Sequence, residues 1–221
     1  MGIHRAELAK MIDHTLLDPT ATREGIERLC EEAKAYNVHA VCVNSNWVPL
    51  AISSLKGSDI KVCSTVGFPL GASLPEVKVF EARTVIGLGA AEVDMVINIG
   101  ALKSQDLAAV RNDIAQVVNS SGGSLVKVII ETAYLTSQEK VQACKLAEEA
   151  GAAFVKTSTG FGAGGATIAD VSLMRKTVGN RLGVKAAGGI RTLRDALDMI
   201  EAGATRIGTS STVQILRECP T

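Results

Sequence analysis

Two lysines lie inside short apolar runs of the sequence. Lys156 follows Phe154 and Val155 in FVKTST, and Lys185 lies between Val184 and Ala186 in GVKAA. A buried ammonium group is costly unless it has a partner or a chemical role. An ordinary lysine has a pKa near ~10.4, so only about one molecule in 2500 carries the neutral, nucleophilic amine at pH 7. Because burial and a nearby cation both favour the neutral amine, the pair predicts one lysine that attacks a carbonyl and a second that activates it.

This pairing suits the breaking of a carbon–carbon bond. A protonated imine on Lys156 would withdraw electrons from the adjacent bond, which could then break without a metal ion. Asp94, in EVDMVIN, is a candidate for moving protons in the same pocket. The alternative for each lysine is a structural ion pair with a carboxylate inside a barrel, and at this point that alternative stays open.

Side-chain alternation along the strands groups the charged residues on one face. In EVDMVIN, for example, Val93, Met95 and Ile97 share the face opposite to Asp94. The same assignment, with hydrophobic side chains toward helices and charges inward, serves four runs. We therefore expect one polar cluster made of Asp94, Lys127, Glu131, Lys156 and Lys185.

Strand-like runs alternate with amphipathic helical stretches over the whole chain of 221 residues. The runs are MIDHTLL, VHAVCVN, IKVCSTVGF, EVDMVINIG, LVKVIIET, FVKTST, GVKAAGG and TRIGTSS. Such alternation indicates a parallel sheet. Eight runs without a linker predict a single α/β domain, residues 1–221, folded as an eightfold parallel (β/α) TIM barrel with an extra N-terminal helix. An open doubly wound sheet is the rival, but no G-x-G-x-x-G fingerprint follows the first run.

Glycines and serines follow the last two runs. GGIRT begins at Gly188, and GTSS ends at Ser211 where the last helix should open. In barrels of this kind an anion site lies after the seventh and eighth strands, where backbone N–H groups and a helix N-terminus favour an oxyanion. We therefore expect Gly188, Gly189, Ser210 and Ser211 to hold a phosphate, with ordinary turn and cap residues as the alternative.

Composition argues against several classes of protein. Lys plus Arg and Asp plus Glu each number 23, so the net charge of zero gives no bulk attraction to nucleic acid or to an anionic membrane. No run approaches the ~20 apolar residues of a membrane span, and the first residues lack an apolar signal core, so we expect a cytoplasmic protein. Five cysteines without a C-x-x-C pair are expected to be reduced. The three histidines are not spaced as metal ligands usually are, so we expect no metal site. We expect no cofactor either.

Five motifs, IDHTLL, EVDMVINIGAL, LVKVIIET, FVKTSTGF and GVKAAGGIRT, together resemble the deoxyribose-phosphate aldolase family of class I aldolases, from Ile12 to Ser211. The resemblance implies reversible cleavage of 2-deoxy-D-ribose 5-phosphate to D-glyceraldehyde 3-phosphate and acetaldehyde. It implies that Lys156 forms the imine, that Lys185 tunes it and shuttles protons, and that Asp94 donates and accepts protons. It further implies that the pocket is lined or supported by Asp13, Thr15, Cys42 and Lys127.

The sequence also departs from this family. It ends in RECPT where some members carry a tyrosine tail, and Phe161 stands where some carry a lysine after TSTG. The alternative functions are another phosphate-binding barrel enzyme, such as an isomerase or a transaldolase-like enzyme, and a non-catalytic phosphosugar-binding protein. The expected partners are a phosphosugar and acetaldehyde, without nucleic acid or membrane. An exposed helix face at residues 22–36 would allow a homodimer.

Overall fold

Helices and strands alternate along the chain as the sequence predicts. The structure, a computed structural model, describes residues 3–220, so the first two residues and the last one of the expected domain lie outside it. The strands are β1 (Ile12–Leu16), β2 (Ala40–Val43), β3 (Lys61–Val66), β4 (Glu92–Val96), β5 (Leu125–Ile129), β6 (Phe154–Lys156), β7 (Gly183–Ala187) and β8 (Arg206–Thr209). The α-helices are α1 (Arg5–Ala9), α2 (Arg23–Tyr36), α3 (Val48–Ser54), α4 (Pro75–Gly87), α5 (Ile99–Lys103), α6 (Leu107–Ser120), α7 (Ser137–Glu149), α8 (Ile168–Val178), α9 (Leu193–Glu201) and α10 (Thr212–Glu218). Two short 3₁₀ helices are η1 (Ser45–Trp47) and η2 (Thr132–Tyr134).

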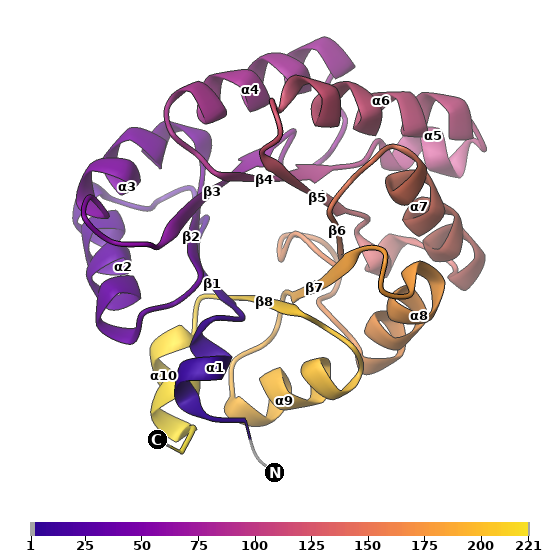
Figure 1. Ribbon diagram of the computed structural model, residues 1–221. Coiled ribbons are helices and arrows are strands. Elements are labelled where there is room, and N and C mark those ends of the chain that lie inside the picture. The colour runs from indigo at the N-terminus through magenta and orange to yellow at the C-terminus, as the bar shows by residue number, and fades with distance from the viewer. Residues whose placement is uncertain (1–2, 221) are drawn as a thin grey trace.

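The strands form a closed parallel barrel in chain order, and the helices surround it (Figure 1). The ring closes between β1 and β8, where Asp13 lies opposite Gly208. The extra helix α1 lies beside the other end of the chain, because Arg5 N donates a hydrogen bond to Pro220 O (3.1 Å). The predicted eightfold barrel with an extra N-terminal helix is therefore confirmed.

Local sequence signals set the helix boundaries. Thr136 caps α7: its hydroxyl accepts the N–H of Glu139 (3.3 Å), and the Glu139 carboxylate accepts the N–H of Thr136 (2.7 Å). This reciprocal capping box satisfies donors that a helix end leaves free. Glycines in the left-handed region end three helices, as expected. They are Gly151, Gly179 and Gly203, with φ of 82°, 56° and 110° after α7, α8 and α9.

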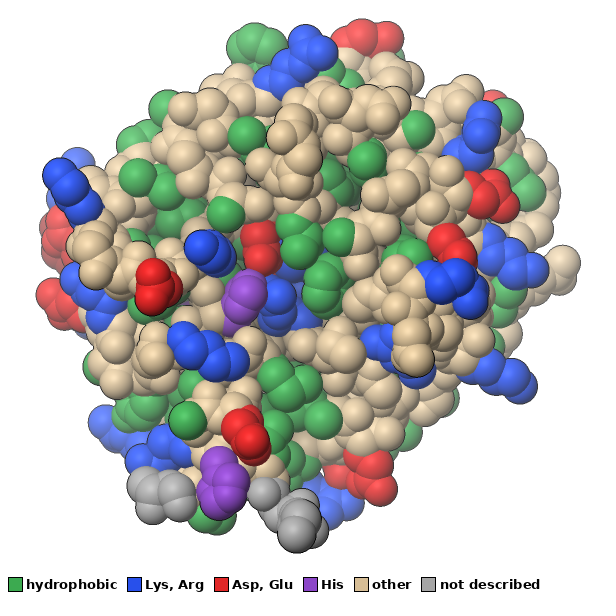
Figure 2. Space-filling view, viewed as in Figure 1, with side chains coloured by type: hydrophobic (Ala, Val, Ile, Leu, Met, Phe, Trp, Pro, Cys, Tyr) green, Lys and Arg blue, Asp and Glu red, His purple; other side chains and the backbone are tan. Residues whose placement is uncertain are grey.

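The two faces of the strands have different roles. The outward side chains of Val93, Val128 and Val184 join one continuous apolar core with the inner faces of the helices, for example Ile114 of α6. Burying each such side chain stabilises the fold by roughly 1.5–3 kcal/mol. The inward face carries buried charged side chains, among them Asp94, Lys127 and Lys185. Figure 2, viewed from the same side as Figure 1, shows a histidine with acidic and basic side chains at the surface over the centre of the ring. Within residues 3–220, every helix falls short of the length and apolarity that crossing a membrane would require.

Candidate active site

Asp94 of β4 lies at the centre of the inward-facing charges. Its Oδ2 atom accepts hydrogen bonds from Nζ of Lys156 and Nζ of Lys185, both at 2.7 Å. Its Oδ1 atom accepts one from Lys127 Nζ at 2.9 Å. The barrel register brings these groups together, since Lys156 lies opposite Lys185 on adjacent strands and Asp94 lies opposite Lys127. One carboxylate thus contacts all three lysines that the alternation of side chains predicted to point inward.

A second layer of charges supports this cluster from the strand starts. Asp13 Oδ2 lies 2.5 Å from Lys185 Nζ, and Asp13 Oδ1 accepts from Arg206 Nη1 at 2.8 Å. Glu92 contacts Lys127 Nζ (2.6 Å) and Arg206 Nη1 (3.3 Å), and its other oxygen lies 2.9 Å from His39 Nε2. Every charged group in this layer therefore has a partner of opposite charge, and the second layer fixes the first.

The prediction for Glu131 is wrong. Its backbone has φ 53° and ψ 67°, which is left-handed, so the alternation of β5 does not continue to this residue. The side chain turns away from the lysines, and its carboxylate accepts the N–H of Thr159 in the chain after β6. Glu131 therefore contacts a loop and not the charged cluster.

The ionisation of the cluster follows from its contacts. Burial alone would raise the pKa of Asp94, but the ammonium groups of Lys127, Lys156 and Lys185 hold it well below its usual range. Burial alone would lower the pKa of Lys185, but the carboxylates of Asp13 and Asp94 raise it above its ordinary value. Lys185 is consequently protonated, and positively charged, beside Lys156 in the resting site. Basic groups outnumber carboxylates by one, four against three: Lys127, Lys156, Lys185 and Arg206 face Asp13, Glu92 and Asp94.

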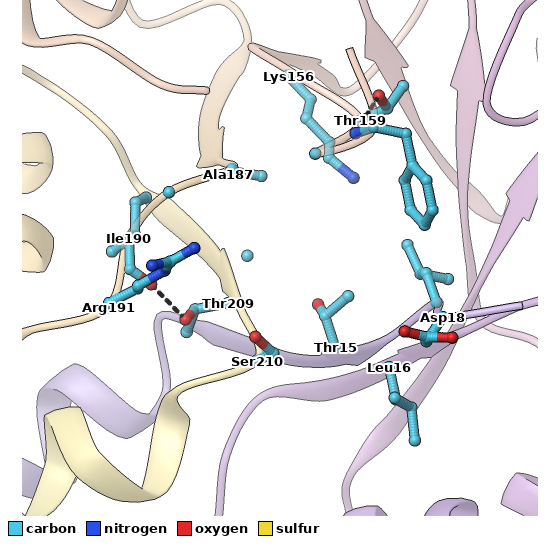
Figure 3. Close-up of a pocket in the computed structure, with 16 residues that line it drawn as sticks. Thr15, Leu16, Asp18, Lys156, Thr159, Ala187, Ile190, Arg191, Thr209 and Ser210 are labelled. Atoms are coloured by element: carbon cyan, nitrogen blue, oxygen red, sulfur yellow. Dashed lines mark hydrogen bonds between the residues drawn. The ribbon is translucent and has the colours of Figure 1, made fainter. Parts of the chain in front are cut away.

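A cavity of about 450 Å³ opens where β1, β6, β7 and β8 end. Among the charged residues of the two layers, Lys156 alone lines it, and Figure 3 shows its amine pointing into the open space. The Lys156 side chain is 3% exposed, whereas those of Lys127 and Lys185 are fully covered. A small molecule in the cavity would therefore meet the amine of Lys156.

The loops after β7 and β8 form another wall of the same cavity. Gly188 (φ 89°) and Gly189 (φ 79°) adopt the left-handed backbone that favours glycine. Both line the cavity together with Ser210. Within residues 3–220, the N–H groups of these three residues donate no hydrogen bond to another group of the protein. Free backbone donors that converge on a cavity suit an anion.

The structure does not bring Ser211 into this wall. Its N–H donates to Thr209 Oγ1 (2.9 Å), and its side chain lines a separate groove beside α10. Conversely, Arg191 lines the cavity although the expected site did not include it, and Figure 3 shows it on the same side as Ile190 and Thr209. Its position as the first basic residue after the glycine pair in GGIRT was the available signal.

Thr15 and Cys42 lie at different depths. Thr15 lines the cavity, and its hydroxyl donates to Asp13 O (2.9 Å). Cys42 is fully buried on β2, opposite Cys63 of β3, whose thiol donates to Asp94 Oδ1 (3.1 Å). Ligand atoms of Cys42, Cys63 and Asp94 lie within 4.8 Å of one another. Lys127 Nζ, 3.3 Å from Cys63 Sγ, supplies the positive charge at that point.

Three residues that contact the charged cluster were not predicted from the sequence. They are Glu92, Arg206 and Cys63. Glu92 shares the inward parity of Asp94, and Arg206 has the parity opposite to the buried Ile207. Strand alternation thus held the signal for both charged residues. Arg206 contacts Asp13 on the neighbouring strand β1, 193 residues away in the sequence, because the ring closes between β8 and β1.

A family model, curated relatives and a solved structure all place the chain in the same family. A family model described as DeoC/LacD family aldolase matches residues 8–217. A deoxyribose-phosphate aldolase of Streptococcus gordonii is 61% identical over 211 residues, which cover 96% of each chain. One from Thermococcus kodakarensis is 60% identical over 222 residues, which cover 99% of each chain. A solved structure described as a unique tetrameric deoxyribose phosphate aldolase from Aeropyrum pernix has a TM-score of 0.89 at 35% identity and covers 97% of this chain and 91% of that one. The chain, with its closed barrel and its lysine in the cavity, belongs to the DeoC/LacD family of aldolases.

Proposed function

We propose that the protein is a class I aldolase that reversibly cleaves 2-deoxy-D-ribose 5-phosphate to D-glyceraldehyde 3-phosphate and acetaldehyde through an imine on Lys156. The observation that carries the proposal is the placement of Lys156. Its amine points into a cavity of about 450 Å³ while the ammonium group of Lys185 contacts the same carboxylate oxygen. A volume of this size is in the range of small-molecule sites, roughly 300–1,000 Å³. The deoxyribose-phosphate aldolases among its relatives support the same reaction.

The charge balance favours Lys156 as the nucleophile. Four basic groups face three carboxylates, so the cluster becomes balanced when one basic group loses its proton. Lys127, Lys185 and Arg206 each contact two or more carboxylates, whereas Lys156 contacts only Asp94. Of the four basic groups, Lys156 therefore gives up the fewest ionic contacts when it loses a proton. The neutral amine then attacks the carbonyl carbon of the sugar, and water leaves to give the protonated imine.

Bond cleavage follows from that imine. The electron pair of the carbon–carbon bond moves to the imine nitrogen, giving an enamine on Lys156, while the hydroxyl-bearing carbon loses its hydroxyl proton and leaves as D-glyceraldehyde 3-phosphate. We assign the proton movements to Asp94 and Lys185, since Asp94 Oδ2 contacts Nζ of both lysines. Protonation of the enamine carbon and hydrolysis then release acetaldehyde. None of these steps uses a metal ion or an organic cofactor.

The remaining residues hold the substrate or the cluster. We assign phosphate binding to the N–H groups of Gly188, Gly189 and Ser210, with Arg191 as the cation of that wall. Ser211 shapes the same loop through its bond to Thr209. Thr15 faces the substrate. Asp13, Cys42 and Lys127 support the site from beneath the cavity, Asp13 and Lys127 by fixing Lys185 and Asp94.

The wider setting of this reaction is also part of the proposal. Residues 1–221 act as one domain in the cytoplasm, with a phosphosugar and acetaldehyde as partners and with neither nucleic acid nor membrane. A homodimer through the exposed face of α2 stays a prediction. The Aeropyrum pernix relative is described as tetrameric.

Trapping with borohydride tests the proposed chemistry. Acetaldehyde and borohydride together should leave an ethyl group on Lys156, located by mass spectrometry of peptides, whereas an isomerase or a binding protein would remain unmodified. Lys156→Ala should remain folded, since this residue makes a single ionic contact, and should lose both trapping and cleavage. Cleavage at the wild-type rate in that variant would exclude Lys156 as the nucleophile.

A further inference from the structure

The loop after β6 supplies part of the cavity wall next to Lys156. Thr159, Gly160 and Phe161 all line the cavity. The loop also adjoins the proposed phosphate wall, because Gly160 Cα lies 3.6 Å from the point that a Cβ on Gly188 would occupy. Its own strand is only three residues long, so contacts outside β6 must hold the loop in place.

We propose that Glu131, after β5, is a positioning residue for the reaction: it holds the β6 loop in the shape that receives the phosphate-bearing part of the substrate. This inference rests on the proposed function, because the consequence of the loop shape is measured with that substrate. Glu131 touches the wall of the cavity and not the reacting atoms, so it acts through Thr159.

The hydrogen bonds from the loop converge on the Glu131 carboxylate. Its two oxygens lie 3.3 and 3.2 Å from Thr159 N, and Oε2 also accepts the Thr159 hydroxyl. Thr159 Oγ1 in turn accepts the N–H of Phe161 at 3.0 Å. A continuous chain of hydrogen bonds therefore runs from Glu131 through Thr159 to Phe161. Thr159 and Phe161 line the cavity.

The backbone around Glu131 is tied to the strand that carries the nucleophile. Ile130 N donates to Lys156 O (3.0 Å), and Thr132 N donates to Thr157 O (2.9 Å). The left-handed conformation between these two bonds directs the side chain over the loop instead of into the barrel. On the other side of the loop, the Thr157 hydroxyl donates to Ala187 O (3.0 Å), so the loop is held from β5 and from β7.

Two features at Glu131 are costly for stability alone. A non-glycine residue in the left-handed region costs roughly 1–2 kcal/mol. Glu131 is also only 1% exposed, and within residues 3–220 the partners of its carboxylate are the N–H and hydroxyl of Thr159 and no Lys, Arg or His. Burying a carboxylate on neutral donors is unfavourable unless those donors are numerous and well placed. Such a combination beside a cavity indicates a residue that is kept for the geometry of the site.

The expected kinetic signature separates substrate binding from imine formation. Without Glu131, the β6 loop loses its anchor, so binding of the phosphorylated sugar weakens. Imine formation with acetaldehyde needs only the amine of Lys156 and should continue. Glu131→Ala should raise KM for 2-deoxy-D-ribose 5-phosphate by about tenfold or more and change kcat by less than about threefold, with borohydride trapping of acetaldehyde within about twofold of wild type.

A set of variants tests the linkage through Thr159. Thr159→Val, which removes the hydroxyl but keeps the N–H, should raise KM for the phosphorylated sugar as Glu131→Ala does. Thr159→Ser keeps a hydroxyl and should have the wild-type KM. Combining Glu131→Ala with Thr159→Val should add little to the effect of Glu131→Ala alone. Glu139→Ala is the control, because the Glu139 carboxylate also accepts the N–H and hydroxyl of a threonine, Thr136, at the start of α7, and pairs in addition with Lys103. It should lower the melting temperature and leave KM unchanged.

The outcomes are distinguishable. If wild type neither cleaves the phosphosugar nor is trapped by acetaldehyde and borohydride, the proposed function fails. If wild type does both, and a folded Glu131→Ala or Thr159→Val keeps the wild-type KM, the positioning role is wrong. A fall in trapping as large as the rise in KM would likewise overturn it, because the effect would then be general to the site. If Glu131→Ala does not fold, Thr159→Val carries the same comparison against Glu139→Ala.

Discussion

Replacing Lys185 by methionine tests whether a neighbouring positive charge makes the Lys156 amine reactive. The two Nζ atoms each lie 2.7 Å from Asp94 Oδ2, so twice that distance, 5.4 Å, is the largest separation they can have. At an effective dielectric constant of ~20, two unit charges at such a separation repel by about 3 kcal/mol. Removing Lys185 also leaves Asp94 with one cation fewer, which strengthens its hold on the Lys156 ammonium. Lys185→Met should therefore reduce the rate of acetaldehyde trapping at neutral pH on the order of a hundredfold.

The measurement is the initial rate of ethyl incorporation at Lys156, followed by mass spectrometry across a pH series. The difference in trapping rate between Lys185→Met and wild type should shrink as pH rises. Lys185→Arg keeps the positive charge and should trap faster than Lys185→Met at neutral pH.

Loss of a buried ammonium group can also destabilise the fold, by roughly 3–5 kcal/mol when a carboxylate is left unpaired. Lys78→Met is the matched control for this effect. Lys78 of α4 is fully buried, and its Nζ lies 2.5 Å from Asp113 Oδ2 of α6 and donates to Val96 O at the end of β4 (2.9 Å). Lys78→Met should lower the free energy of unfolding and leave trapping unchanged. A folded Lys185→Met that is trapped at the wild-type rate at neutral pH would refute the electrostatic argument.

Two further predictions concern acid stability and phosphate recognition. Burial would raise the pKa of Glu92, but its hydrogen bond with His39 and the charge of Lys127 lower it to about 2, and the pKa values of Asp13 and Asp94 are also lowered. Since these folded-state values lie below the unfolded ones, the stability they contribute is present above about pH 4 and is lost as pH falls through the folded pKa, by about 3 kcal/mol for Glu92. Urea unfolding followed by circular dichroism between pH 6 and pH 2 should show this loss, and a constant free energy of unfolding would contradict it. Arg191→Ala should raise KM for the phosphorylated sugar about tenfold and leave KM for free 2-deoxyribose unchanged; an equal rise for both sugars would remove Arg191 from the phosphate wall.

Strand alternation predicted which side chains face inward, but it could not predict their depth. Lys156 and Lys185 look equivalent in the sequence, since each follows a buried valine. The structure separates them, because Lys156 lines the cavity whereas Lys185 is sealed beneath it by Asp13 and Asp94. That difference depends on where each strand ends relative to its neighbours, which is a property of the closed ring.

The wrong prediction for Glu131 has a local physical cause. Counting by twos from Lys127 assigned Glu131 to the cluster, but β5 ends at Ile129 and the left-handed backbone at Glu131 ends the alternation. Ser211 was assigned to the phosphate from its place in GTSS after the eighth strand; its N–H donates to Thr209 Oγ1, and a role at the phosphate stays a prediction. Helix boundaries were more predictable, as at Thr136, because caps depend on residues three positions apart. The extent of the domain, the homodimer and the cytoplasmic location stay predictions.

The separation of an apolar outer layer from a charged interior bears on how such a protein can change over evolutionary time. Much of the packing lies between strands and helices, where Val93, Val128 and Val184 are buried on the face opposite to the charged groups. Exchanging an acid and its basic partner together for uncharged residues of similar volume is often neutral for stability, whereas losing one member is not. Descendants of this chain could therefore acquire a different reaction through balanced sets of interior substitutions, with the scaffold unchanged.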